Sequence, residues 1–326
     1  MKKFFFLFAL ACMVLSAHAE ATIGYLMTMN KKEAFPAETF EGVDEKPEYN
    51  AAAWFETTYI NNGTGRYVTL PEAAMGDLSA LKAIWVNVDR VDLADLEAAG
   101  VTADVVAGLK AYVENGGNLF VTKQANQIIY QMGRMGYEPN WAAGGYHVGG
   151  DNWQINPHLC LWPPMGGEMD RSNHPIFKGL TTETRSFDFT YEGDTAATTV
   201  SYTVFPLVGA VSRTDNNNFW IDYFRKDPMT GGKMEELEGT THYQNDNVLR
   251  LTDYEADWNL TVLSVWGQVL DNCSGGLVVF HPDGDFKGTI ISCGFAAYQW
   301  GTSNNFISNV QQLTANALDI LTGNVN

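Results

Sequence analysis

The sequence predicts an α/β protein with a mostly parallel central sheet flanked by helices, and with a β- and loop-rich insertion at residues 141–258. Two observations carry this prediction. Apolar strand-like segments alternate with helical ones through the first third of the chain, a pattern typical of parallel sheets covered by helices. The last third returns to the same patterning after the insertion, so we expect residues 20–326 to form a single elaborated domain.

The first third supplies most of the expected parallel sheet. We predict strands at 21–29, 66–70, 83–88 and 118–121, and helices at 50–59, 78–81, 103–114 and 125–135. The strand at 83–88 is almost continuously apolar, as in strands buried on both faces. The helix at 103–114 carries one apolar face and ends at Gly116 and Gly117. Residues 31–49 are polar and contain Pro and Gly, so we expect a loop there.

The remaining chain divides into the insertion and a closing unit. The insertion is rich in Gly, Pro, Asn, Thr and aromatic residues, with few helical periods and with alternating runs at 199–207 and 219–224. After it we predict a strand at 260–266, a hairpin of 276–280 and 288–293 around Pro282-Asp283-Gly284-Asp285, and a final helix at 309–321.

The first nineteen residues read as a cleaved secretory signal. Lys2 and Lys3 precede an apolar run from Phe4 to Leu15, and small residues follow before Glu20. The run is shorter than the roughly 20 apolar residues that span a bilayer, and no later segment qualifies. We therefore expect export to the periplasm or the cell exterior without membrane insertion. Cys12 raises lipid anchoring as an alternative, which is disfavoured because the usual aliphatic residue three positions earlier is missing.

Charge and cysteine content exclude several classes of partner and fold. The sequence contains 20 basic and 38 acidic residues, which gives a formal net charge of −18. Removal of the expected leader, which contains Lys2 and Lys3, makes this charge more negative. Such a field repels nucleic acid and anionic lipid, and suits neutral or cationic ligands better. The remaining cysteines, Cys160, Cys273 and Cys293, lack CxxC spacing and allow at most one disulfide, with buried unpaired thiols as the alternative.

Three stretches, together with the order of elements, carry a family resemblance. They are GGNLFVT at 116–122, HPIFKGL at 174–180 and GTIISCGFAAYQW at 288–300, ahead of the final helix. They resemble the class I glutamine amidotransferase-like fold, particularly its ThuA-like branch, and uncharacterised secreted domains of gut anaerobes whose neighbours often handle polysaccharides. The resemblance implies a flavodoxin-type open sheet and a role in polysaccharide utilisation.

The same resemblance argues against glutaminase chemistry. Amidotransferases of this fold use a cysteine at a turn from strand to helix, with a histidine and a carboxylate two residues apart. Here that turn holds Lys123-Gln124-Ala125, so the nucleophile is missing. His281 and Asp283 echo the His-x-Glu ending, although Asp283-Gly284 is also a hairpin turn signal. We therefore expect no catalytic triad, no metal and no cofactor.

In open α/β sheets, ligands bind beyond the carboxyl ends of the strands. The residues predicted at that edge are Thr28, Asn30, Asn87, Asp89, Lys123, Gln124, Tyr298, Gln299 and Trp300. Lys123 and Gln124 could bind hydroxyls or a carboxylate, or could only cap a solvent-exposed helix start. Tyr298 and Trp300 could offer a platform for a sugar ring, or could pack in the core under the last helix.

The insertion adds aromatic, histidine and carboxylate side chains on glycine-rich loops, a chemistry that suits a carbohydrate cleft but also suits loop packing. We predict an oligo- or polysaccharide ligand held by Lys123, Gln124, His147, Trp153, His174, His281, Tyr298 and Trp300. Three alternatives stay open. Glycan hydrolysis would need two carboxylates about 5–10 Å apart, for which Glu168 and Asp170 are candidates. A metal site at His147, His158 and His174 with Asp151 or Glu168 would match no standard spacing. The third alternative is a structural module of the cell envelope.

Overall fold

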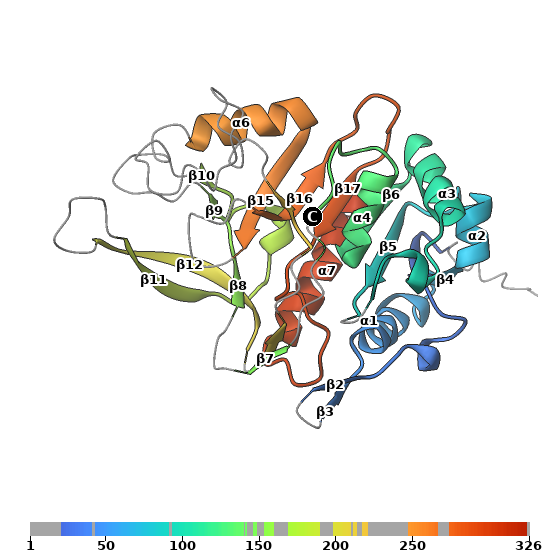
Figure 1. Ribbon diagram of the computed structural model, residues 1–326, viewed down its shortest axis with the longest axis horizontal. Coiled ribbons are helices and arrows are strands. Elements are labelled where there is room, and N and C mark those ends of the chain that lie inside the picture. The colour runs from blue at the N-terminus through green and yellow to red at the C-terminus, as the bar shows by residue number, and fades with distance from the viewer. Residues whose placement is uncertain are drawn as a thin grey trace, which may run out of the picture.

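The computed structural model describes residues 21–40, 43–90, 93–139, 141, 146–148, 153–159, 169–189, 198–209, 211–213, 217–220, 247–266 and 274–324. The expected leader at 1–19 lies outside these ranges. Within them, an eleven-stranded sheet runs in the order β11-β12-β8-β15-β16-β17-β6-β5-β1-β4, with β14 also paired to β16. Figure 1 shows this sheet crossing the molecule from the projecting β11–β12 hairpin to β4.

The sheet has a parallel part and an antiparallel part. The parallel strands are β1 (Ile23–Met27), β4 (Gly65–Thr69), β5 (Ala83–Val88), β6 (Asn118–Lys123) and β17 (Ile290–Cys293). The antiparallel strands are β8 (Trp153–Asn156), β11 (Glu183–Phe189), β12 (Thr198–Val208), β14 (Phe219–Trp220), β15 (Leu260–Trp266) and β16 (Ser274–Phe280). The predicted α/β class with a mostly parallel central sheet is confirmed, and the strands of the insertion extend that sheet.

Three short antiparallel pairs lie outside the main sheet. They are β2 (Glu38–Phe40) with β3 (Val43–Glu45), β7 (Tyr146–Val148) with β13 (Val211–Arg213), and β9 (His158–Leu159) with β10 (Met169–Asp170). The β2–β3 hairpin falls within the segment 31–49 that the sequence predicts as a loop. Its short strands carry too few alternating positions to be recognised from the sequence.

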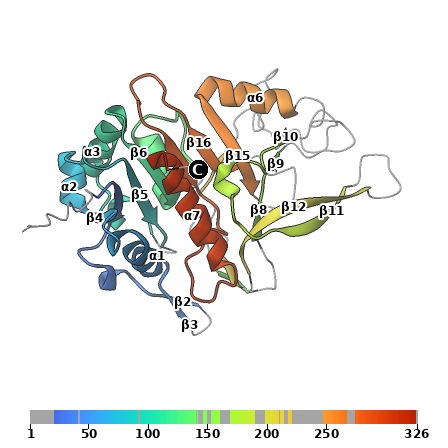
Figure 2. The same cartoon turned by 180° about the vertical axis from the view of Figure 1, so that it is seen from behind.

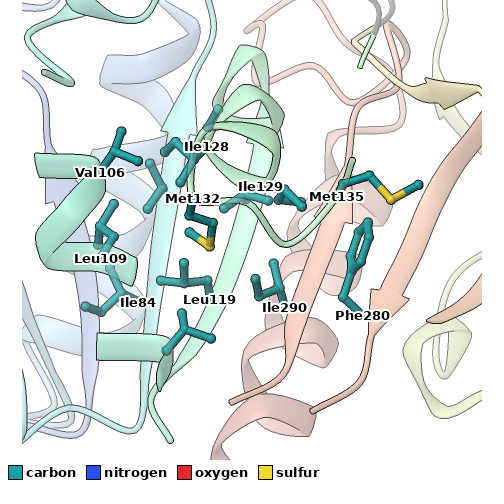
Figure 3. Close-up of a cluster of buried hydrophobic side chains, with 14 of the residues drawn as sticks. Ile84, Val106, Leu109, Leu119, Ile128, Ile129, Met132, Met135, Phe280 and Ile290 are labelled. Carbon is teal, nitrogen blue, oxygen red and sulfur yellow. The ribbon is translucent and has the colours of Figure 1, made fainter. Parts of the chain in front are cut away.

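Helices cover both faces of the sheet (Figures 1 and 2). One face packs against α2 (Leu70–Met75), α3 (Ala103–Glu114), α4 (Gln127–Gln131) and α6 (Asn247–Trp258). The other packs against α1 (Pro47–Phe55) and α7 (Ile307–Thr322). Figure 3 shows the first of these cores, in which Leu109 and Ile129 from the helices meet Ile84 and Leu119 of the sheet. Among the described helices, none has the length and apolarity needed to cross a membrane.

Several helices differ from their predicted positions. Residues 78–81 form a turn, whereas α2 lies directly after β4, where Thr69 and Glu72 form a reciprocal capping box. The helix expected from Asn50 begins at Pro47, because proline at the first helical position needs no hydrogen-bond partner for its nitrogen. The helix expected to reach residue 135 ends by Gln131, and Gly133 follows with a positive φ of 81°.

The helix α6 lies in the insertion, where few helical periods are visible. Its buried side chains include Leu251 and Tyr254, and Trp258 packs partly against the same core. This spacing places the three side chains on one helix face. The prediction failed here because the surrounding composition is typical of loops and outweighed a short helical pattern.

Gly108 sets the distance between α2 and α3. A Cβ atom at this position would lie 1.8 Å from the carbonyl oxygen of Ala73, so the two helix backbones touch. We expect Gly108→Ala to lower the free energy of unfolding by about 3 kcal/mol, since a backbone contact cannot relax as a side chain can. The matched control is Ala107→Gly at an exposed position of α3, expected to cost at most about 1 kcal/mol. Urea denaturation of both variants measures the difference, and equal losses would contradict the packing argument.

Candidate functional site at the carboxyl ends of the parallel strands

The carboxyl ends of β1, β5, β6 and β17 meet at one edge of the sheet because these strands are parallel and in register. Val88 of β5 pairs with Lys123 of β6, and Thr122 pairs with Cys293 of β17. The polar residues that follow β1, β5 and β6 are almost fully buried: Thr28, Asp89, Arg90, Lys123 and Gln124. Buried charged groups need partners. We define these five residues as the strand-end cluster.

Lys123 occupies the turn from strand to helix in an unusual backbone conformation. Its φ is 59° and its ψ is −131°, a region that side-chain-bearing residues rarely adopt and that costs about 1–3 kcal/mol. This sharp strand-to-helix turn is the type of backbone that presents the nucleophile in α/β-hydrolases. The geometry of a nucleophile turn is therefore present, with a lysine in the place of the nucleophile.

The Lys123 side chain is turned into the protein. Its Nζ lies 3.8 Å from Oδ1 of Asp89, and both side chains have no exposed surface. The same Nζ donates to the carbonyl oxygens of Phe295 and Ala296, at 3.4 and 3.3 Å. The sequence left open whether Lys123 binds a ligand or caps a solvent-exposed helix start. The structure shows a buried ion pair at this position, and solvent exposure is excluded because the site is covered.

A second buried ion pair lies beside the first. Arg90 Nε donates to Glu48 Oε2 at 2.7 Å, and its Nη2 donates to Thr28 Oγ1 at 2.7 Å. Glu48 Oε1 accepts from the backbone N–H of Asp89. Burial raises the pKa of Glu48 to about 7, although Arg90 acts in the opposite direction. Burial and the Arg90 charge therefore act on the Glu48 carboxyl in opposite directions.

Gln124 joins the two ion pairs through the backbone. Its Oε1 accepts from the Arg90 N–H at 2.9 Å, and its Nε2 donates to the Arg90 carbonyl oxygen. The amide side chain therefore ties the end of β6 to the end of β5. This arrangement uses both polar atoms of Gln124 and stabilises the position of Arg90.

Next to these charged residues, three buried side chains of β5 and β6 are linked by hydrogen bonds. Trp85 Nε1 donates to Thr122 Oγ1 at 3.0 Å, and Thr122 Oγ1 donates to Asn87 Oδ1 at 2.7 Å. The ring of Tyr25 packs edge-on against Trp85, with centroids 5.0 Å apart. Burial raises the pKa of Tyr25 well above its usual value, so this phenol is neutral at physiological pH.

The first turn of α1 contacts the strand-end cluster through Glu48, and the segment just before it contacts the loop after β17. Glu45, at the end of β3, accepts hydrogen bonds from the backbone N–H groups of Thr302 and Ser303, at 2.7 and 3.0 Å. Asn50 Nδ2 donates to the carbonyl oxygen of Trp300 at 2.8 Å. Gly301 leaves room for the carboxylate, because a Cβ there would lie 3.3 Å from Glu45 Oε2. We call residues 45–50 the cover.

Two aromatic candidates, Tyr298 and Trp300, lie in the core. Their exposed fractions are 0% and 1%. Trp300 packs against Trp54 and Trp85, and the Tyr298 hydroxyl hydrogen-bonds that of Thr314 on α7. A sugar platform needs an exposed ring face, so the structure shows the alternative arrangement, core packing under the last helix.

His174 and His281 lie away from the strand-end cluster. His281 follows β16, whose end pairs with the start of β17, so it lies at the opposite edge of the sheet. Its Nε2 is 2.8 Å from Thr261 Oγ1. Burial lowers the pKa of His174, with further contributions from Arg171 and His281, which places these groups near one another. Asp283 closes a turn with Phe286, as the hairpin alternative predicts.

Other candidates are described only in part. His147 and Trp153 lie on β7 and β8, but their side chains are outside the described residues, as are Asp151, Cys160, Glu168 and Cys273. Cys293 is a buried free thiol, and burial raises its pKa to about 12. Within the described part of the chain, no group of three His, Cys, Asp or Glu side chains could hold a metal ion.

Sequence reasoning found part of the cluster and missed its cover. Thr28, Asn87, Asp89, Lys123 and Gln124 are all predicted at this edge, since each directly follows or ends an expected strand. Glu45 and Glu48 were assigned to a loop. The signal that could have placed Glu48 is the preceding Pro47, which favours the first position of a helix, with an acidic residue in the first turn.

Comparisons with known proteins give distant structural likeness only. No family model matches the chain, and no curated protein matches it. A ThuA-like protein from Bacteroides uniformis is similar at 11% identity and a TM-score of 0.40, over 93% of this chain and 91% of that one. A cytoplasmic protein from Salmonella typhimurium LT2 is 10% identical with a TM-score of 0.42, over 92% and 99%.

A third similar structure is a β-galactosidase from Bacillus circulans sp. alkalophilus, 12% identical with a TM-score of 0.36. The match covers 93% of this chain and 31% of the galactosidase. Likenesses this distant assign no activity, so the function has to be argued from the site.

Proposed function

We propose that this chain is an exported, amidotransferase-like domain of the ThuA-like type that binds a carbohydrate-type ligand and performs no cysteine-based amide hydrolysis. The observation that carries the second part is the buried Lys123–Asp89 ion pair at the strand-to-helix turn. A nucleophile must reach its substrate. The Lys123 side chain, which stands at the nucleophile position, is instead turned into the protein and paired with the Asp89 carboxylate.

The nearest described thiol does not replace the missing nucleophile. Cys293 lies in β17 and is fully buried, and its raised pKa keeps it protonated at neutral pH. The thiolate is the reactive form of cysteine. The His281-Pro282-Asp283 segment gives no base to this turn either, since it lies at the other edge of the sheet.

The amide-hydrolysis part is tested by ammonia release from glutamine. We expect none from the wild-type chain, and none from Lys123→Cys, because the described histidines His174 and His281 lie away from this turn. Circular dichroism must show that the variant is folded. Ammonia release by the variant, with none from wild type, would mean that a working base does lie within reach of residue 123.

Carbohydrate binding is supported by the aromatic and glycine-rich composition of the insertion and by the net charge, which favours neutral ligands. Isothermal titration against a panel of neutral oligosaccharides tests it, with chromatography of the same samples to detect cleavage. We expect saturable binding with intact ligand. Absence of binding across the panel would favour a structural role in the cell envelope.

Export is supported by the leader pattern at 1–19. Expressing the full chain in a bacterial host and fractionating the cells should recover it outside the cytoplasm, with a mass that places the new amino terminus near Glu20. Recovery of the uncleaved chain from the cytoplasm would contradict this part of the proposal.

A second candidate function, glycan hydrolysis, is favoured by one observation. Burial raises the pKa of Glu255, whereas hydrogen bonds with Ser172 and the charge of His158 outweigh burial and lower the pKa of Asp170. Carboxylates with pKa values pushed apart are typical of an acid and a base in one site. Product release that Glu255→Gln or Asp170→Asn abolishes would establish this function. Because Arg171 Nη2 donates to both carboxylate oxygens of Glu255, circular dichroism must show that the Glu255→Gln variant remains folded.

A further inference from the structure

A cavity of about 530 Å³ lies at the amino ends of β5, β6 and β17, the edge of the sheet opposite the strand-end cluster. Its walls come from the turn before β5, the end of α3, the start of β17 and the end of α7. We call it the amino-edge cavity. Its volume is in the range of small-molecule sites in proteins. It is therefore large enough for a small ligand such as a disaccharide.

Asn118, at the start of β6, fixes the shape of the amino-edge cavity. Its Nδ2 donates to the carbonyl oxygens of Lys82 and Leu321, at 3.0 and 2.8 Å. Its Oδ1 accepts from the backbone N–H of Thr289 at 2.7 Å. One amide side chain thus joins the segments before β5 and β17 to the end of α7. Because these contacts lie within the chain, the walls are held in place without a ligand.

Exposed polar side chains on the cavity wall are available to a ligand. Ser79, Lys82 and Asn115 line the cavity, and within the described part of the chain their side chains make no hydrogen bond or ion pair. Together they offer a hydroxyl, an ammonium and an amide, which between them donate and accept hydrogen bonds. Ile320, partly exposed on α7, adds an apolar surface. This lining suits a ligand that has both hydroxyl groups and apolar C–H faces.

The charges around the cavity nearly cancel. Lys82 is the one charged side chain in the described lining. The carboxyl-terminal ends of α3 and α7 both reach the cavity. Each such helix end carries about half a negative charge, so the two together offset one ammonium. An anion would meet the two helix ends and a cation would meet Lys82, so a neutral ligand is favoured.

We propose that the amino-edge cavity binds a neutral sugar, whose hydroxyl groups pair with Ser79, Lys82 and Asn115. This inference rests on the carbohydrate-binding function proposed above and gives that function a place in the fold. The place differs from the strand-end edge that the sequence predicts, because the charged groups there are buried and paired with one another. Sugar hydroxyls donate and accept, so one ligand can pair with all three side chains.

Ser79→Trp tests the cavity by filling it. Ser79 and Ala80 are adjacent exposed residues of the turn from Leu78 to Leu81, and Ser79 lines the cavity whereas Ala80 does not. Isothermal titration with maltose, cellobiose, lactose and xylobiose measures the affinity. For each disaccharide that the wild-type chain binds, Ser79→Trp should weaken binding by about tenfold or more. Ala80→Trp, the matched control, should leave the affinity unchanged, and both variants should keep the wild-type melting temperature.

Lys82→Met tests the charged part of the lining. It should weaken binding of the same neutral disaccharides by about tenfold, the loss of one hydrogen bond from a charged donor. Lys31→Met, which removes an exposed lysine away from the cavity, is the control and should have no effect. Digalacturonate, an acidic disaccharide, should bind the wild-type chain about fivefold more weakly than the neutral ones, because two helix ends oppose it. Tighter binding of digalacturonate that depends on Lys82 would overturn the assignment to a neutral ligand.

Hydrogen exchange of the wild-type chain locates the bound disaccharide without any substitution. Amides in residues 79–82, 115–118 and 321–323 should exchange more slowly in the complex, while those of residues 89–90 and 124–126 should not change. Protection at the second set instead would overturn the inference.

The outcomes separate this inference from the function on which it rests. If the wild-type chain and Ser79→Trp bind a disaccharide equally well, the cavity is not the site, and carbohydrate binding still stands. If the wild-type chain binds none of the four neutral disaccharides, the inference is overturned, and the panel of longer oligosaccharides decides the proposed function separately.

Discussion

Lys123→Met should lower the free energy of unfolding by about 3–5 kcal/mol, the range seen when one partner of a buried ion pair is removed. Asp89 would keep its burial and lose the cation 3.8 Å away. Methionine has a similar length and leaves the backbone strain in place, so the change isolates the charge. Urea denaturation at neutral pH measures the loss.

Two further variants test whether the loss in Lys123→Met comes from the buried charge of Asp89. Lys110→Met removes the partly exposed partner of Glu114 on α3, at 3.7 Å, together with a hydrogen bond to the Met132 carbonyl, and should cost about 1 kcal/mol. Adding Asp89→Asn to Lys123→Met should recover part of the loss, because the uncompensated charge disappears. A loss below about 1 kcal/mol for Lys123→Met would show that Asp89 is satisfied without the lysine.

Arg90→Met should be comparably destabilising, and its effect should depend on pH. Arg90 is the cation that opposes the burial of Glu48, and it contacts that carboxylate at 2.7 Å. Without it, Glu48 is expected to remain protonated to higher pH than in the wild type. We expect a loss of about 3 kcal/mol at pH 8 and a smaller loss at pH 5.

The direction in which stability changes with pH follows from proton linkage. The pKa of Glu48 in the folded chain is about 7, above the usual value of 4.5, so the folded state binds more protons than the unfolded one between these limits. The Glu48 contribution therefore falls as pH rises through that window, by at most about 1.4 kcal/mol per pH unit. Arg90→Met should raise the pKa of Glu48 further, and so extend this pH range to higher pH.

Urea denaturation of Arg90→Met from pH 5 to pH 8 measures this dependence. Arg90→Met combined with Glu48→Gln should lose the added pH dependence, because the titrating group is gone. Arg66→Met, which removes the partly exposed ion-pair partner of Glu72, is the control and should show a small loss that is the same from pH 5 to pH 8. A pH-independent loss for Arg90→Met would contradict the assignment to Glu48.

Elements with a long apolar pattern were predicted well. The strand Ala83–Val88 is buried at every position, and the helix Ala103–Glu114 has the expected bounds. Their periodicity is a local property, and the sheet enforces it by burying the same faces. Elements with weak patterns were missed, as α6 and the β2–β3 hairpin show, since their positions depend on contacts with distant segments.

For the candidate site, the positions of the residues were predictable from the sequence, but their burial and their partners were not. Lys123 and Gln124 were found because the Gly116–Gly117 turn and the following strand fix where a sheet edge must lie. Their state was not predictable. Whether a lysine at that edge is exposed or buried depends on Asp89 of another strand and on carbonyls of Phe295 and Ala296, far along the chain.

The sequence by itself determined the α/β class, the parallel strands and the absence of a cysteine at the strand-to-helix turn, because strand periodicity and residue identity at that turn are local. Only the tertiary structure decided that Lys123 is ion-paired under a cover, that Tyr298 and Trp300 belong to the core, and that His174 and His281 lie elsewhere. Burial and charge pairing arise between segments distant in the chain, and no single stretch of sequence encodes the distance between them.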